Sequence, residues 1–220
     1  HYNSYALSAR WAPDANTSIQ PFWSRIAVRG EESQSYIFTS GDFLPKRYKR
    51  SRFYGQKWSD FNSNIDTYGA VAKTELAGFD LALGAFRQTV DAKDDNIDLL
   101  FDTDQTGRVG SRIIVSDKDN WFASTSGEFK LSRELGDGLL RHYIHSTARG
   151  RSLVRRYGGT ALIDLGVSQL GVEDFRPAPV GTVYGAKTHD RVRQKTAGMG
   201  YELRWKKRGE ISLGVQKTDY

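Results

Sequence analysis

Apolar and polar residues alternate along much of this chain with a period of two, which is the period of side chains along a β-strand. Leu81 and Leu83, for example, fall on one side of such a strand, while Asp80 and Gln88 fall on the other. The alternation predicts eight strands in four pairs, at residues 5–11 and 22–29, 68–76 and 79–88, 121–132 and 140–148, and 194–205 and 211–216.

The connections between these strands are alternately short and long. Gly-containing turns join the members of pairs, at Ala77-Gly78, Gly136-Asp137-Gly138 and Lys207-Arg208-Gly209. The segments 30–64, 91–120 and 152–189 join one pair to the next, although loops above about 12–15 residues are uncommon in compact domains. Outer-membrane barrels combine short periplasmic turns with long extracellular loops. We therefore predict an all-β, antiparallel, up-and-down transmembrane β-barrel segment in the bacterial outer membrane, with residues 1–220 as a single unit.

The two faces of the predicted strands differ in polarity. A lipid-facing role is predicted for the apolar positions Leu81, Leu83, Phe129, Leu131, Met199, Tyr201, Leu203, Leu213 and Val215. The opposite face is expected to line a wet interior, because it carries Lys73, Glu75, Glu128, Lys130, Gln194, Glu202, Arg204 and Gln216. A soluble sandwich would instead pack large aliphatic side chains between its sheets. Aromatic residues near predicted strand ends suit membrane interfaces, namely Trp11, Tyr68, Phe79, Trp121 and Trp205.

Composition narrows the class of protein. Hydrophobic residues make up 38% and aromatic residues 12%, and mean hydropathy is −0.58. No apolar run approaches the ~18 residues of a membrane-spanning helix. The net charge is +6, but charges alternate in sign outside the basic stretch 46–52, so nucleic acid is not expected as a partner. There is no cysteine, and no export signal at the start, so we expect the chain to belong to a longer protein.

The long connections contain apolar and aromatic residues, so we expect them to fold rather than to act as polar linkers. The first connection carries the basic stretch interleaved with rings, a composition that suits an anionic or aromatic ligand. A solvated loop face, or contact with phosphates of surface lipopolysaccharide, explains this composition equally well. The candidate ligand-binding residues are Arg47, Tyr48, Arg50, Arg52, Phe53, Tyr54 and Trp58, with Arg155, Arg156 and Tyr157 further along the chain.

No catalytic, metal-binding or cofactor-binding constellation is recognisable, so the chain is not expected to be an enzyme. The four histidines His1, His142, His145 and His189 are scattered. His142 and His145 lie three apart on a predicted strand and should point to opposite faces. The aspartates between 91 and 104 lack the spacing of a calcium loop, and we expect a solvated acidic loop there.

Three stretches, at residues 53–60, 125–133 and 155–159, resemble the barrel of TonB-dependent outer-membrane receptors. The resemblance implies a barrel of about twenty-two strands around a plug domain. It also implies import of a ligand such as an iron-siderophore, driven through the TonB system. We expect the plug domain, the TonB-binding segment and the closing strands to lie outside residues 1–220. Two alternatives remain: a self-contained small barrel with a structural or adhesive role, and a soluble extracellular β-domain that binds carbohydrate or protein.

Overall fold

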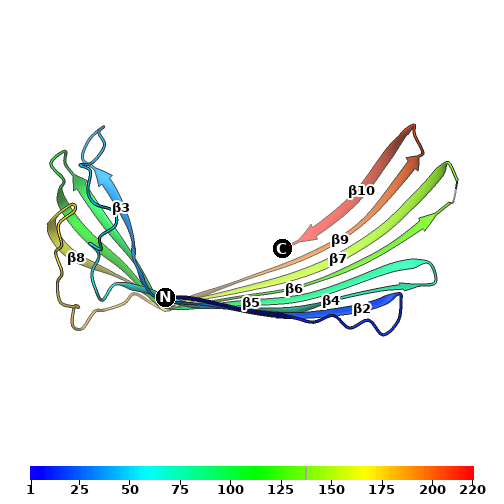
Figure 1. Cartoon of the computed structure of the whole chain (residues 1–220), viewed down its shortest axis with the longest axis horizontal. Helices are drawn as coiled ribbons and strands as arrows, with labels where there is room; N and C mark the ends of the chain where they lie inside the picture. The colour runs from blue at the N-terminus through cyan, green and yellow to red at the C-terminus, as the bar shows by residue number, and fades with distance from the viewer. Residues whose placement is uncertain (137) are drawn as a thin grey trace.

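The computed structural model describes residues 1–136 and 138–220 and confirms the all-β prediction (Figure 1). Its strands are β1 (Tyr2–Ser8), β2 (Thr17–Glu32), β3 (Gln34–Thr39), β4 (Asp60–Leu76), β5 (Phe79–Thr103), β6 (Arg108–Leu135), β7 (Leu140–Tyr157), β8 (Thr160–Gln169), β9 (Thr188–Trp205) and β10 (Gly209–Asp219). No helix among the described residues has the length and apolar content of a membrane span.

Eight of the strands form one curved antiparallel sheet in the order β1-β2-β4-β5-β6-β7-β9-β10. They correspond one to one with the eight strands predicted from the alternation. Each strand pairs with its neighbours in up-and-down fashion, and the sheet is not closed into a cylinder by the described residues. The antiparallel, up-and-down arrangement is therefore confirmed. We call these paired strands the main sheet.

Short connections join successive strands at one end of the main sheet, which we call the turn end. β4 and β5 are joined by Ala77 and Gly78 alone, with φ of 53° and 75°. Positive φ at both central residues is the geometry of a type I′ turn, whose twist matches that of the flanking strands. The turn predicted at Gly136-Asp137-Gly138 includes Asp137, which lies outside the described residues.

The prediction of a loop over residues 91–120 is wrong, because β5 and β6 continue through this region as one long hairpin. Ile97 pairs with Val115 and Leu99 with Ile113, so the period-two pattern continues to the turn after Thr103. Within that turn the amide nitrogens of residues 106 and 108 both donate to Asp104 Oδ1, at 2.8 and 3.0 Å. This hairpin therefore extends well beyond the neighbouring strands β4 and β7.

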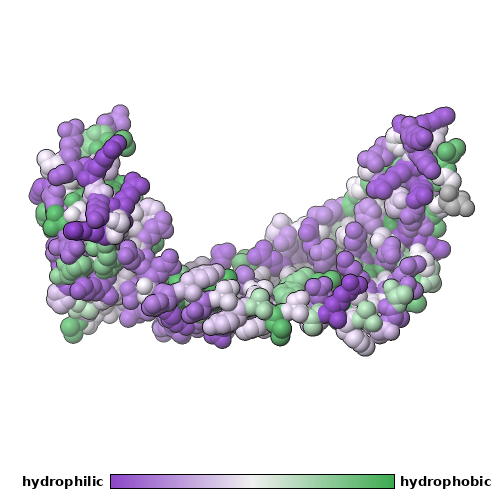
Figure 2. Space-filling view, viewed as in Figure 1, coloured by the Kyte–Doolittle hydropathy of each residue, from purple (hydrophilic) through white to green (hydrophobic). Residues whose placement is uncertain are grey.

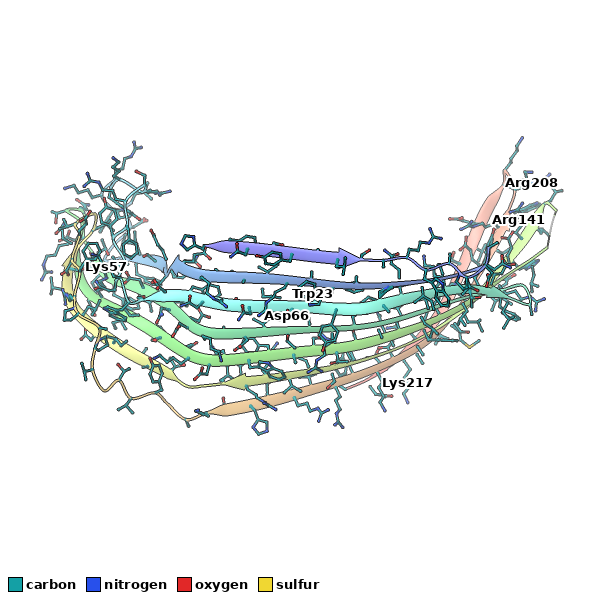
Figure 3. The ribbon with its side chains drawn as sticks, turned by 60° about the horizontal axis from the view of Figure 1, so that its bottom comes forward. Trp23, Lys57, Asp66, Arg141, Arg208 and Lys217 are labelled. Carbon is teal, nitrogen blue, oxygen red and sulfur yellow. The ribbon has the colours of Figure 1, made fainter. Side chains whose placement is uncertain are left out.

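The far ends of β5 and β6 carry two further strands that the alternation did not predict. β3 pairs with β5 in parallel, and β8 pairs with β6 antiparallel. We call this four-stranded arrangement, β3-β5-β6-β8, the distal sheet. In Figure 1 it rises from the main sheet on the side toward which β9 and β10 also curve. Figure 3 labels Lys57 at this distal end, and Arg141 and Arg208 at the turn end.

The register of the main sheet assigns side chains to its two faces. Leu83 lies opposite Phe129, and Met199 lies opposite Val215, as expected for residues that share a face. Following each pairing across the sheet places all nine predicted lipid-facing residues on one face, which we call the apolar face. The eight predicted interior residues all fall on the opposite, polar face. Contact of the apolar face with lipid stays a prediction.

Burial is concentrated in the distal sheet rather than in the main sheet. Leu100, Val109 and Leu170 form a buried cluster, against which Ile37 and Tyr48 pack. In the main sheet Leu83, Met199 and Val215 stay 45%, 61% and 73% exposed, because no second layer covers them. Figure 2 accordingly shows hydrophobic and hydrophilic residues interspersed over the visible surface. The small core of the described residues therefore lies at the distal end.

The aromatic residues lie at strand ends less consistently than predicted. Phe79 begins β5 and Trp205 ends β9, as expected for a girdle at the turn end. Tyr68 and Trp121, however, lie inside β4 and β6, because both strands extend further than the alternation indicated. Trp11 lies outside β1 and forms an isolated bridge with Ile19.

Candidate ligand site in the distal sheet

A cavity of about 220 Å³ opens on the face of the distal sheet that continues the polar face. Its floor comes from β5 and β6, where Asp98, Leu100 and Arg112 alternate on one face. One wall is the connection between β3 and β4, and the other is the end of β8. Four predicted ligand-binding residues line it: Tyr48, Arg50, Arg52 and Tyr54. The fold therefore brings part of the predicted site together.

The floor of the cavity is fixed by a buried ion pair. Arg112 Nη2 donates to Asp98 Oδ2 at 2.6 Å and Arg112 Nε donates to Asp98 Oδ1 at 3.0 Å, which is the bidentate arrangement. The two residues are only 4% and 1% exposed. Arg112 Nη2 also donates to the carbonyl oxygen of Tyr54 at 2.8 Å. The pair thus joins the hairpin to the wall that carries the candidate residues.

The wall presents rings on the inside and positive charge at the mouth. Tyr48 contacts the buried apolar cluster, and its ring meets that of Tyr54 edge-on at 5.7 Å between centroids. Arg50 and Arg52 are exposed, and neither has an ion-pair partner within the part of the chain that the structure describes. Glu32 is the other acidic residue at the cavity besides Asp98. The mouth therefore offers guanidinium groups that are free to meet an anion.

The two connections that cover the distal sheet are tied to each other. Gln56 is fully buried, and its side chain donates to the carbonyl oxygen of Asp174 at 2.7 Å and accepts from the amide of Arg176 at 2.8 Å. Trp58 Nε1 donates to the carbonyl oxygen of Arg176 at 3.1 Å, and Phe53 stacks on Phe175. Phe53 and Trp58, predicted to bind ligand, therefore serve in this structure as anchors between the connections.

Replacing Gln56 by leucine is expected to loosen the connection over residues 170–187. Leucine keeps most of the volume but removes the hydrogen bonds to the half-buried carbonyl of Asp174 and amide of Arg176, at a cost of about 0.5–1.5 kcal/mol for each. Hydrogen exchange of the Arg176 amide in the full-length protein measures this loss. The matched control is Gln105→Leu, on the exposed β5–β6 turn, which should leave that amide protected. Equal protection in both variants would contradict the anchoring role.

A second ion pair lies within the connection between β8 and β9. Arg176 Nη2 donates to Asp174 Oδ2 at 2.6 Å, and this hydrogen bond holds the pKa of the Asp174 carboxyl below its ordinary value. Because the pKa of Asp174 is lower in the folded chain than in the unfolded chain, the ion pair contributes its full stabilisation at pH values above 3.8, the pKa in the unfolded chain. This stabilisation is lost as the pH falls through the pKa in the folded chain. Both side chains are one-third exposed, so the contribution is small.

The remaining predicted residues do not reach the cavity. Arg47 is exposed on the same connection but does not line it. Arg155 and Arg156 are neighbours on β7 and point to opposite faces: Arg155 approaches Asp190 at 3.9 Å, and Arg156 lies over the Trp121 ring at 4.9 Å. The ring of Tyr157 meets that of Phe122. The structure therefore separates these three from the others.

Asp98 and Arg112, the residues at the centre of the cavity floor, were not predicted from the sequence. Both lie within residues 91–120, where a solvated acidic loop was expected, and the burial of Asp98 shows that this expectation was wrong. The available signal was alternation: Asp98 and Leu100 share one face, as do Arg112 and Ile114. His142 and His145, predicted to point to opposite faces, do so, since His142 lies opposite Leu203 and His145 opposite Gly200.

No protein-family model and no curated protein sequence matches this chain. Several solved structures are similar to it, including three bacterial receptors. The first is BauA, the ferric preacinetobactin receptor of Acinetobacter baumannii, with a TM-score of 0.69 and 12% sequence identity. The second is Fiu, the ferric-catecholate import receptor of E. coli K12, with a TM-score of 0.73 and 10% sequence identity. The third is FpvA of P. aeruginosa in complex with an iron-bound pyoverdine, with a TM-score of 0.62 and 14% sequence identity.

The similarity extends over the whole of this chain but only part of each receptor. The matches cover 99%, 98% and 100% of this chain, and 33%, 33% and 30% of the receptors. The chain thus spans about a third of the length of the proteins it matches. Identities this low establish the fold alone, and the chain has the fold of a β-barrel segment of these receptors, which confirms its resemblance to TonB-dependent receptors at the level of the fold.

Proposed function

We propose that this chain is part of the barrel wall of a bacterial outer-membrane receptor, and that its distal sheet captures an anionic ligand such as a ferric siderophore. The observation that carries the proposal is the convergence of Arg50 and Arg52 with Tyr48 and Tyr54 around one cavity. This cavity lies beyond the end of a sheet that has one apolar and one polar face. Capture at the outer end of a membrane-embedded wall suits this arrangement.

The chemistry of the cavity favours a chelate over a simple sugar. Guanidinium groups form charge-assisted hydrogen bonds to anionic oxygens, and tyrosine rings offer flat surfaces to planar groups. A cavity of about 220 Å³ accommodates one arm of such a chelate rather than the whole. Each of the three similar receptors is named for, or bound to, a ferric chelate. This supports transport of the same class of ligand, with no enzymatic step.

The partners follow from the same proposal. The apolar face meets outer-membrane lipid, and the polar face surrounds a plug domain through which the TonB system supplies energy. The polar face suits an aqueous interior because charged residues recur along it, for example Lys73 on β4, Glu128 on β6 and Glu202 on β9. Residues 1–220 then act as one wall segment that carries ligand-capture elements at its outer end.

Removing both free guanidinium groups should weaken ligand binding. In the full-length protein, Arg50→Gln combined with Arg52→Gln is expected to lower the affinity for ferric chelates by at least about tenfold, because each charge-assisted hydrogen bond is worth roughly 1.5–3 kcal/mol. Quenching of tryptophan fluorescence by a panel of ferric catecholates and ferric hydroxamates measures the affinity.

The same connection provides a matched control. Arg47→Gln combined with Lys49→Gln removes the same charge from residues that do not line the cavity, and it should leave the affinity unchanged. Equal losses in the two double variants would mean that the basic stretch acts only through its overall field. Unchanged affinity in both would assign it to a solvated loop face.

A further inference from the structure

One face of β9 changes from apolar to basic halfway along the strand. Its alternate positions from the turn end are Trp205, Leu203, Tyr201, Met199 and Ala197, followed by Lys195, Arg193 and Arg191. Side chains two apart share a face, so all eight project from the apolar face. The register supports this assignment. Met199 lies opposite Val215 and Lys195 lies opposite Asp219, and Val215 and Asp219 share one face of β10. We call Arg191, Arg193 and Lys195 the basic ladder.

The basic ladder is open to solvent and has few competitors. All three side chains are exposed, and none forms an ion pair with any described residue. On β7 the residues opposite Lys195 and Arg193 are Gly150 and Ser152, which leave the space above them clear. At Gly150 no atom lies within 4 Å of the position that a Cβ would occupy.

Two further cations flank the basic ladder on the same face. Lys217 of β10, labelled in Figure 3, shares its row with Ala197 and approaches Asp219 at 3.8 Å. Arg156 of β7 pairs with His189 in the register and lies over the Trp121 ring. Arginine beside tryptophan is a combination suited to the boundary between hydrocarbon and headgroups. Five cations and one carboxylate, that of Asp219, therefore lie together on this part of the apolar face.

The position of the basic ladder along the strand matches a membrane boundary. From Trp205 to Ala197 the strand advances eight residues, which is roughly 26 Å along its axis at ~3.3 Å per residue. A strand tilted by ~45° then crosses roughly 19 Å of depth, most of the ~25 Å apolar band of an outer-membrane barrel. The basic ladder begins where that band ends, at the distal side of the sheet.

We propose that Arg191, Arg193 and Lys195 bind the phosphate groups of anionic lipid headgroups at the outer boundary of the bilayer. This inference rests on the proposed function, because it requires the apolar face to meet lipid. Charge complementarity identifies the partner: the cations of the basic ladder lie about 7 Å apart along the strand, and a phosphate between two of them receives donors from both.

The test uses the full-length protein in neutral detergent, titrated calorimetrically with a short-chain phosphatidic acid. The triple variant Arg191→Gln, Arg193→Gln, Lys195→Gln should bind this lipid about a hundredfold more weakly, since each basic residue near anionic lipid contributes about fivefold. The matched control removes three cations from the polar face, with Lys130→Gln, Arg149→Gln and Arg151→Gln, and should bind as the unaltered protein does.

Two probes distinguish the source of the phosphate. A short-chain phosphatidylcholine should bind at least tenfold more weakly than the phosphatidic acid, and inorganic phosphate should not displace the lipid at equal concentration. Equal binding of the neutral lipid, or displacement by inorganic phosphate, would overturn the proposal. So would a triple variant that keeps its affinity, or a control that loses as much.

Failure of this inference is distinguishable from failure of the proposed function. A cysteine at position 199, from Met199→Cys, reports whether the apolar face reacts with a lipid-soluble thiol probe in membranes. Absence of that reaction would remove the membrane position of the face, and with it the proposed function. If position 199 reacts and the triple variant still binds phosphatidic acid normally, only the basic ladder loses its assignment.

Discussion

Replacing Arg112 by methionine is expected to destabilise the distal sheet by about 3–5 kcal/mol, because it leaves the Asp98 carboxylate buried without its partner. Asp98 is 1% exposed, so water cannot take the place of the guanidinium without opening the hairpin. The carbonyl oxygen of Tyr54 loses its donor as well. Hydrogen exchange over residues 96–116 of the full-length protein measures the change, and ligand affinity should fall with it, since both residues line the cavity.

A double substitution separates the buried charge from the loss of packing. Asp98→Leu together with Arg112→Met removes both charges and should recover most of the lost protection, because buried ion pairs are often replaceable by apolar residues of similar size. Arg176→Gln removes the cation of the one-third exposed pair with Asp174 and should cost less than about 1 kcal/mol. If the Arg112 variant were no less protected than the Arg176 variant, the floor of the cavity would not depend on its ion pair.

The strands of the main sheet were predictable because their signal is local. In a single-layered sheet every second side chain meets one environment, so alternation is visible within each strand and does not depend on its partners. β3 gave no such signal, whereas β8 does alternate, with Ile163, Leu165 and Val167 at every second position, although it was not among the predicted strands. In β3 the apolar residues Tyr36, Ile37 and Phe38 are consecutive, and the strand exists because it pairs with β5 in parallel, more than 50 residues further along the chain.

The candidate site was predictable in part for the same reason. The basic and aromatic residues of the β3–β4 connection are close in sequence, so Tyr48, Arg50, Arg52 and Tyr54 were identified together. Arg112 reaches Asp98 only across the β5–β6 hairpin. Once that hairpin was interpreted as a loop, nothing in the sequence indicated a buried pair.

The anchoring residues illustrate a limit of composition as a guide. Phe53 and Trp58 resemble ligand-contacting aromatics by type and position, yet their partners are Phe175 and the backbone of Arg176, more than 110 residues away. Arg155 and Arg156 were grouped because they are adjacent, whereas adjacency on a strand places side chains on opposite faces. A strand assignment extended to Tyr157 would have separated them without any structure.

Placing a charge at the middle of the apolar face should show which face meets lipid. Leu83→Arg puts a guanidinium beside Phe129 and Ala72, on the face whose neighbours are apolar, and at the centre of a bilayer this costs about 2–4 kcal/mol. The matched variant is Gln88→Arg, on the same strand but on the polar face, between Thr67 and Ser124. It should be nearly neutral, because the proposed interior is aqueous.

Unfolding of the full-length protein from lipid vesicles by denaturant measures both variants. A loss of unfolding free energy confined to Leu83→Arg would place lipid against the apolar face, because an aqueous surface would tolerate the charge of arginine. A loss confined to Gln88→Arg would reverse the assignment of the faces. If both variants were neutral, each face would be wet, and the exposed leucine, methionine and valine side chains would need a protein partner rather than a membrane.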